Sequence, residues 1–113
     1  MINKEELIKI LSELDIPLNE GLSSKSNTNK FPRIVFWEYV WDELDASDSS
    51  YDTVVTYQIS MHYKDPRKKE VLELRKKLHD YGLRPVIYHE HFEEKKEFHS
   101  FLSMEVLENL DSR

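Results

Sequence analysis

The segment 53–63 alternates between apolar and polar residues from Val55 onward, and this pattern constrains the fold more than any other feature of the chain. The apolar positions are Val55, Tyr57, Ile59, Met61 and Tyr63. Successive side chains of a β-strand point to opposite faces of the sheet, so these residues share one face. Such a strand is typical of an antiparallel sheet that packs against other elements on one side only.

Two amphipathic helices are predicted to cover that sheet. Residues 4–14 place leucine and isoleucine at helical spacing, after a capping-box pattern formed by Asn3 and Glu6. The second helix is predicted to begin at Asp65-Pro66 and to end at Gly82, which is placed for a left-handed C-cap. Its apolar stripe comprises Val71, Leu74, Leu78 and Tyr81.

Three further strands are predicted at 34–41, 85–92 and 98–107, and a charged turn at 93–97 joins the last two. This order of elements predicts an α+β fold, α-β-β-α-β-β, in which two helices pack on one face of a four-stranded antiparallel sheet. The 113 residues suit a single domain over 1–113, with mobile loops at about 19–30 and 42–52. The expected core comprises Leu7, Leu11, Leu14, Tyr57, Ile59, Met61, Val71, Leu74, Leu78, Leu102, Met104 and Val106.

Trp37, Tyr39 and Trp41 occupy every second position of the first predicted strand, so they are expected on one face. Two placements satisfy the pattern. If Ile34 and Phe36 pack under the helices, the aromatic side chains form an exposed patch typical of an interaction surface, and one glutamate enters the core. If the aromatic side chains pack in the core instead, Ile34 and Phe36 lie outside. The sequence leaves both placements open.

His89 and His91 lie two residues apart in a predicted strand, on one face and about 7 Å apart. His99 in the next strand would complete a three-histidine site of a metal-dependent enzyme if the hairpin register placed it on that face. We expect instead an exposed polar face, on which His89 and His91 are candidates for a contact with a partner.

The composition predicts no catalytic, cofactor or metal site. Acidic residues gather in predicted loops, where we expect solvated charge, two glycines cannot build a phosphate-binding loop, and cysteine is absent. A net charge of −6 argues against direct readout of nucleic acid, and the apolar runs are too short to cross a membrane. These features favour a binding function in a reducing compartment.

Three stretches of sequence follow one another in a distinctive order. They are Lys-Glu-Glu-Leu-Ile-Lys-Ile-Leu at 4–11, Phe-Pro-Arg-Ile-Val-Phe-Trp-Glu at 31–38, and Tyr-Gln-Ile-Ser-Met-His-Tyr at 57–63 followed by Lys-Asp-Pro. In this order they resemble the small tail proteins of siphophages and prophages of Gram-positive bacteria, over nearly the whole chain. The chain departs from the family's pattern at Trp37 and Trp41 and in its histidine-rich third strand.

The resemblance implies a tail terminator, or tail completion protein, which is a non-enzymatic structural protein of the virion with this same fold. Such proteins form a ring, typically six-fold, that stops growth of the tail tube and presents a surface to the head. The implied partners are further copies of the chain, the major tail protein and the head–tail connector protein. Assembly would take place in the cytoplasm of the bacterial host.

Two other functions remain open at this point. One is a different head–tail joining protein of similar size. The other is a cytoplasmic regulatory or inhibitor module that covers a basic partner with its acidic loops.

Overall fold

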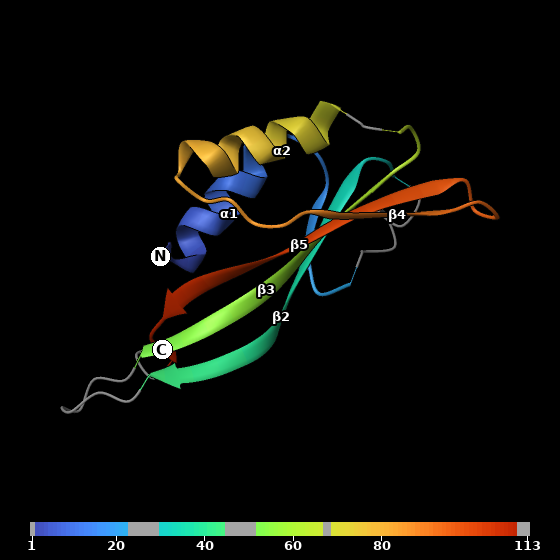
Figure 1. Ribbon diagram of the computed structural model, residues 1–113. Coiled ribbons are helices and arrows are strands. Elements are labelled where there is room, and N and C mark those ends of the chain that lie inside the picture. The colour runs from blue at the N-terminus through green and yellow to red at the C-terminus, as the bar shows by residue number, and fades with distance from the viewer. Residues whose placement is uncertain (1, 23–29, 45–51, 67–68, 111–113) are drawn as a thin grey trace.

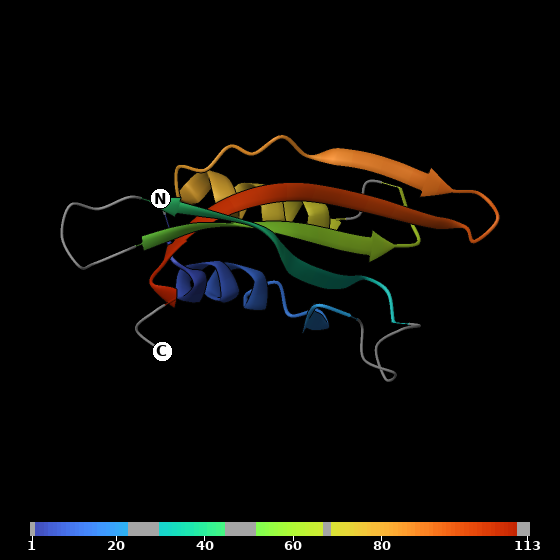
Figure 2. The ribbon, with the colours of Figure 1, turned by 90° about the horizontal axis from the view of Figure 1, so that it is seen from below.

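The computed structural model describes residues 2–22, 30–44, 52–66 and 69–110. The elements in order are α1 (Lys4–Ser12), β1 (Leu18–Glu20), β2 (Arg33–Leu44), β3 (Asp52–Tyr63), α2 (Lys69–Asp80), β4 (Tyr88–Phe92) and β5 (Glu97–Glu108). The strands form one sheet in the order β1-β2-β3-β5-β4, and both helices lie on the same face of it (Figure 1). Figure 2 shows the other face, which no described helix covers. The predicted α+β class is confirmed.

The sheet is mixed and has five strands, so the prediction of four antiparallel strands is wrong in detail. β1 pairs parallel to β2, with Leu18 opposite Ile34 and Glu20 opposite Phe36. The backbone N–H of Gly21 extends this pairing by donating to the carbonyl of Phe36 at 2.8 Å. Three residues are too few to show a period, and the sequence therefore placed 19 and 20 in a loop; residues 23–29 of that loop lie outside the described residues.

A complete capping box starts α1, as predicted. Asn3 Oδ1 accepts a hydrogen bond from the backbone N–H of Glu6 at 2.8 Å, and Glu6 Oε1 accepts one from the backbone N–H of Asn3 at 3.2 Å. Both groups would otherwise be unpaired at the helix start. α1 ends at Ser12, two residues before the predicted end, and Asp15 follows in a left-handed conformation with φ 55°.

The end of α2 is as predicted, and its start is not. Gly82 adopts φ 77°, its N–H donates to the carbonyl of His79 at 2.9 Å, and the N–H of Leu83 donates to Leu78 at 2.9 Å. This pattern is a Schellman C-cap. Its left-handed position favours glycine, which has no Cβ to clash with the backbone. The described helix begins at Lys69, so the predicted start at 65–66 precedes it; residues 67–68 lie outside the described residues.

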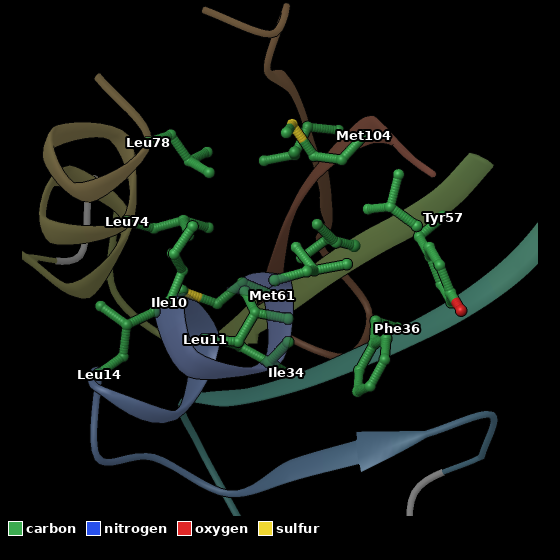
Figure 3. Packing of buried hydrophobic residues seen from close by; sticks show 14 of the residues in the cluster. Ile10, Leu11, Leu14, Ile34, Phe36, Tyr57, Met61, Leu74, Leu78 and Met104 are labelled. Carbon is green, nitrogen blue, oxygen red and sulfur yellow. The ribbon is translucent and has the colours of Figure 1, made fainter. Parts of the chain in front are cut away.

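The core lies between the two helices and one face of the sheet (Figure 3). Every residue of the predicted core is buried. Ile34 and Phe36 join it from β2, facing Leu11 and the aromatic ring of Tyr57. Tyr81, which the sequence placed on the apolar stripe of α2, is 40% exposed, because it follows the last helical residue.

The observed bounds of four strands differ from the predicted ones. β2 extends to Leu44 and β3 begins at Asp52, so the expected loop at 42–52 shrinks from both sides, and residues 45–51 lie outside the described residues. β4 begins only at Tyr88, whereas the sequence predicted a strand from Pro85. β5 is longer than predicted and pairs with β3 from Phe98 to Glu108.

Candidate interaction surface

A β-bulge in β2 separates the aromatic residues that the sequence placed on one face. Trp37 pairs with Gln58 of β3, Tyr39 lies at the register shift, and Trp41 pairs with Val55. Residues directly opposite in an antiparallel pair share a face. Gln58 is exposed on the open face and Val55 is buried on the helix-covered face, so Trp37 and Trp41 lie on opposite faces. The prediction of one aromatic face is therefore wrong, because an inserted residue reverses the alternation beyond it.

The aromatic side chains of β2 are exposed on either side of the bulge. The exposed fraction is 56% for Trp37, 53% for Tyr39 and 58% for Trp41. Burial of Ile34 and Phe36 decides between the two placements that the sequence left open. The Tyr39 hydroxyl reaches across β3 to within 2.9 Å of Ser103 Oγ, which keeps this ring on the open face beside Trp37.

A shallow hollow on the open face begins at Trp37. Its volume is about 490 Å³, and its lining residues are Gly21, Leu22, Val35, Trp37, Gln58 and Ser60. Leu22 is 88% exposed and lies next to the β1 edge. Gly21 has φ 89°, and a Cβ there would lie 3.9 Å from the Trp37 ring. We call the combination of Leu22, Trp37 and Tyr39 the open-face patch.

The far end of β2 carries a second exposed group, Trp41–Leu44, which we call the β2 tip. Leu44 is 45% exposed, and Asp42 and Glu43 supply two negative charges beside Trp41. Thr53 of β3, itself buried, donates from Oγ1 to Glu43 Oε2 at 2.8 Å and holds that carboxylate against the hairpin. Both views place the β2 tip at the end of the molecule opposite the β4–β5 turn (Figures 1 and 2).

The histidines do not form the three-histidine site. His89 pairs with Ser100 and His91 with Phe98, so both lie on the helix-covered side, as expected of residues two apart. His99 pairs with Glu90 and His62 and therefore lies on the open face. Among the described residues, no group of three or more histidine, aspartate or glutamate side chains is arranged to hold a metal ion.

His62 and His99 form a stacked pair that the sequence did not reveal. Their ring centroids are 4.6 Å apart with parallel planes, and His99 Nδ1 lies 2.7 Å from Glu90 Oε1. Burial, which is the largest cause, and the charges of the neighbouring His99 and Arg33 together lower the pKa of His62 to about 4. His62 is therefore neutral at pH 7. Only the β3–β5 register brings these rings together, and the register was unknown from the sequence.

A groove of about 540 Å³ lies on the helix-covered side, and we call it the α2 groove. α2 contributes Val71, Leu72, Arg75 and His79, and the segment before β4 contributes Pro85 and Ile87. His89, predicted as a partner contact, lines the groove, and its Nδ1 lies 2.7 Å from Ser100 Oγ. His91 lines a separate hollow beside Phe92. The sequence gave no signal of this groove.

No protein-family model matches this chain, and no curated protein matches its sequence. None of the described helices has the length and apolar character required to span a membrane.

Proposed function

We propose that this chain is a non-enzymatic assembly protein of a phage or prophage tail, of the tail terminator kind. In this role it caps the tail tube and presents a surface to the head–tail connector. The observation that supports the proposal best is the uncovered sheet face with its open-face patch, which adds an exposed contact surface to the sequence resemblance.

An uncovered face of this composition suits a contact with another protein. Large apolar patches on a monomer mark interaction surfaces, and tryptophan and tyrosine are enriched at the centres of protein interfaces. Trp37 and Tyr39 lie next to each other on this face, and the nearby Leu22 is almost fully exposed. The hydroxyl of Tyr39 is already fixed by Ser103, so its ring loses little conformational freedom on binding.

The surrounding polar groups fit the rim of such an interface. Gln58 Nε2 donates to Ser60 Oγ at 3.2 Å along the same face, next to Trp37. An apolar centre with a polar, hydrogen-bonded border is the usual anatomy of a specific interface. We assign the open-face patch to the major tail protein at the end of the tail tube.

The test is co-sedimentation of the chain with tubes assembled from the major tail protein of the same phage or prophage. We expect the wild type to pellet with tubes, and the variant Trp37→Ala/Tyr39→Ala to lose most of this binding. Tyr81→Ala is the matched control, because it removes a ring that is 40% exposed on the helix layer, and it should bind as the wild type does.

Other outcomes would redirect or overturn the proposal. Binding to the connector protein but not to tubes would indicate a head–tail joining protein instead. Stoichiometric binding to a protein of the bacterial host, with no binding to tubes, would favour the regulatory module. Equal tube binding by the double variant and the wild type would show that the open-face patch does not contact the tube.

A further inference from the structure

The α2 groove combines an apolar interior with a positively charged border. Val71 and Leu72 line one side and Ile87 the other, while Arg75 and His79 stand on the α2 side. Among the described lining residues there is no aspartate or glutamate. A groove of this composition favours an occupant with an apolar side chain next to negative charge.

The electrostatics around His79 support the same chemistry. Partial removal from water lowers the pKa of His79, and the charges of Arg75 and Arg84 lower it further, whereas Asp80 acts in the opposite direction. Asp80 is itself paired with Lys76 at 3.3 Å. His79 is therefore neutral at pH 7, and the positive charge at this border comes from Arg75, with Arg84 close by, in a chain whose net charge is −6.

The β2 tip has the complementary composition. Trp41 and Leu44 offer two exposed apolar side chains, and Asp42 and Glu43 lie between them. The register is regular beyond the bulge, so Trp41 and Glu43 point to one face of the hairpin and Asp42 and Leu44 to the other. An apolar anchor with an adjacent carboxylate is thus available on each face.

The chain cannot place its own β2 tip in its own groove. The molecule is 52 Å long, and the β2 tip lies at the end opposite the β4–β5 turn (Figure 1). The groove is lined by residues of α2 together with Tyr63, the last residue of β3, and Phe98, near the start of β5 beside that turn. The tip and the groove are therefore available to different molecules.

We propose that the β2 tip of one copy docks in the α2 groove of the next copy, with Trp41 in the apolar interior and the carboxylate of Glu43, which lies on the same face as Trp41, facing Arg75. Such a contact joins two different patches and repeats head to tail, so it closes into a ring when the rotation permits. This inference deepens the proposed function, since it supplies the contact between subunits and leaves the open-face patch free for the tube.

A cross-linking experiment tests the contact directly, because the chain contains no cysteine. Leu44→Cys in the tip and Leu72→Cys in the groove change side chains that are about half exposed, so both variants should fold. A short bismaleimide is added to each variant alone and to their mixture, with and without tail tubes. We expect a cross-linked dimer from the mixture and little from either variant alone. The double variant Leu44→Cys/Leu72→Cys should give a ladder of higher oligomers.

A second pair of variants measures the contact without cross-linking. Trp41→Ala removes the anchor, and Leu72→Glu places a negative charge in the groove. Each should weaken self-association, measured by sedimentation across concentration, roughly tenfold or more. Mixing the two variants should restore a dimer but no larger species, because one intact tip and one intact groove remain. Tyr81→Ala is the control and should associate as the wild type does.

The outcomes separate this contact from the proposed function. Failure of the mixture to cross-link in either condition, or equally strong cross-linking when Tyr88→Cys replaces Leu72→Cys, would overturn the contact. Maleimide labelling of the Leu72→Cys variant can also be timed in the presence of tail tubes or of added wild-type chain. If tubes slow the labelling and the wild-type chain does not, the groove binds the tube protein, and the proposed contact between copies is overturned. If the contact forms but no variant or wild type pellets with tubes, the contact stands and the proposed function fails.

Discussion

The hydroxyl of Tyr57 offers a sharp test of how the sheet is held together. Tyr57 is fully buried, and its hydroxyl donates to Glu108 Oε2 at 2.9 Å and lies 3.5 Å from Glu38 Oε2. Burial, the hydrogen bond to Glu108 and the charges of both carboxylates raise the pKa of the Tyr57 phenol. The group is therefore a neutral donor at any accessible pH.

We expect Tyr57→Phe to reduce the free energy of unfolding by about 2 kcal/mol, the usual worth of a hydrogen bond to a charged group. The ring is retained, so its contact with Phe36, with centroids 5.9 Å apart, should persist and no cavity should form. Stability is lost because Glu108 is only 8% exposed. Its carboxylate remains removed from water in the variant but no longer accepts the hydrogen bond from Tyr57. For a chain of this size, the melting temperature should fall by roughly 8 °C.

The assay is urea unfolding followed by circular dichroism, with Tyr39→Phe as the matched control. Tyr39 also loses one hydroxyl and one hydrogen bond, of 2.9 Å to Ser103, but on the exposed face. It should cost under about 0.5 kcal/mol, because water replaces the lost partner. Equal losses in the two variants, or a Tyr57→Phe protein as stable as the wild type, would refute the reasoning from burial.

Three further predictions concern other parts of the fold. Because the pKa of His62 is about 4 when folded and 6.5 ordinarily, the unfolded chain binds the proton first. Wild-type stability should therefore fall by about 2 kcal/mol more than that of His62→Gln between pH 7.5 and pH 5, as followed by urea unfolding. Gly82→Ala should cost about 1 kcal/mol through backbone strain alone, since nothing lies within 4 Å of the added Cβ; a stabilised variant in thermal unfolding would contradict the C-cap. Leu11→Ala should cost about 3 kcal/mol and Leu72→Ala under about 1 kcal/mol in urea unfolding, because Leu11 is fully buried and Leu72 is half exposed.

The sequence predicted those parts of the fold that depend on a sustained period or a local signal. The alternation in β3 identified the buried face from Val55 to Tyr63, the capping box at Asn3 identified the start of α1, and Gly82 identified the end of α2. Each of these depends on residues within one turn or one strand. Sequence spacing records them directly.

The missed features depend on pairing between distant segments. The three residues of β1 have no period of their own and are defined by their parallel pairing with β2. The bulge at Tyr39 breaks the alternation, and no glycine or proline in the sequence indicates it, which is why Trp41 was wrongly predicted to share a face with Trp37. The β3–β5 register, not the spacing of histidines, puts His99 beside His62 and away from His89.

Of the candidate surfaces, one involves residues that the sequence singled out and the other does not. The sequence singled out Trp37 and Tyr39 but left open whether they are exposed or buried, and the structure shows that both are exposed. The α2 groove was not predicted, because its walls come from α2 and from the segment 85–89, which meet only in the folded chain.

The proposal that this chain terminates a tail tube can be tested by measuring the lengths of tail tubes. The major tail protein is allowed to polymerise with and without the chain, and tube lengths and tube ends are recorded by electron microscopy. If the chain caps tubes, the tubes should become shorter as the chain is added, and a ring of density should be visible at one end of each tube. Tubes of unchanged length with bare ends at saturating chain would contradict the proposal.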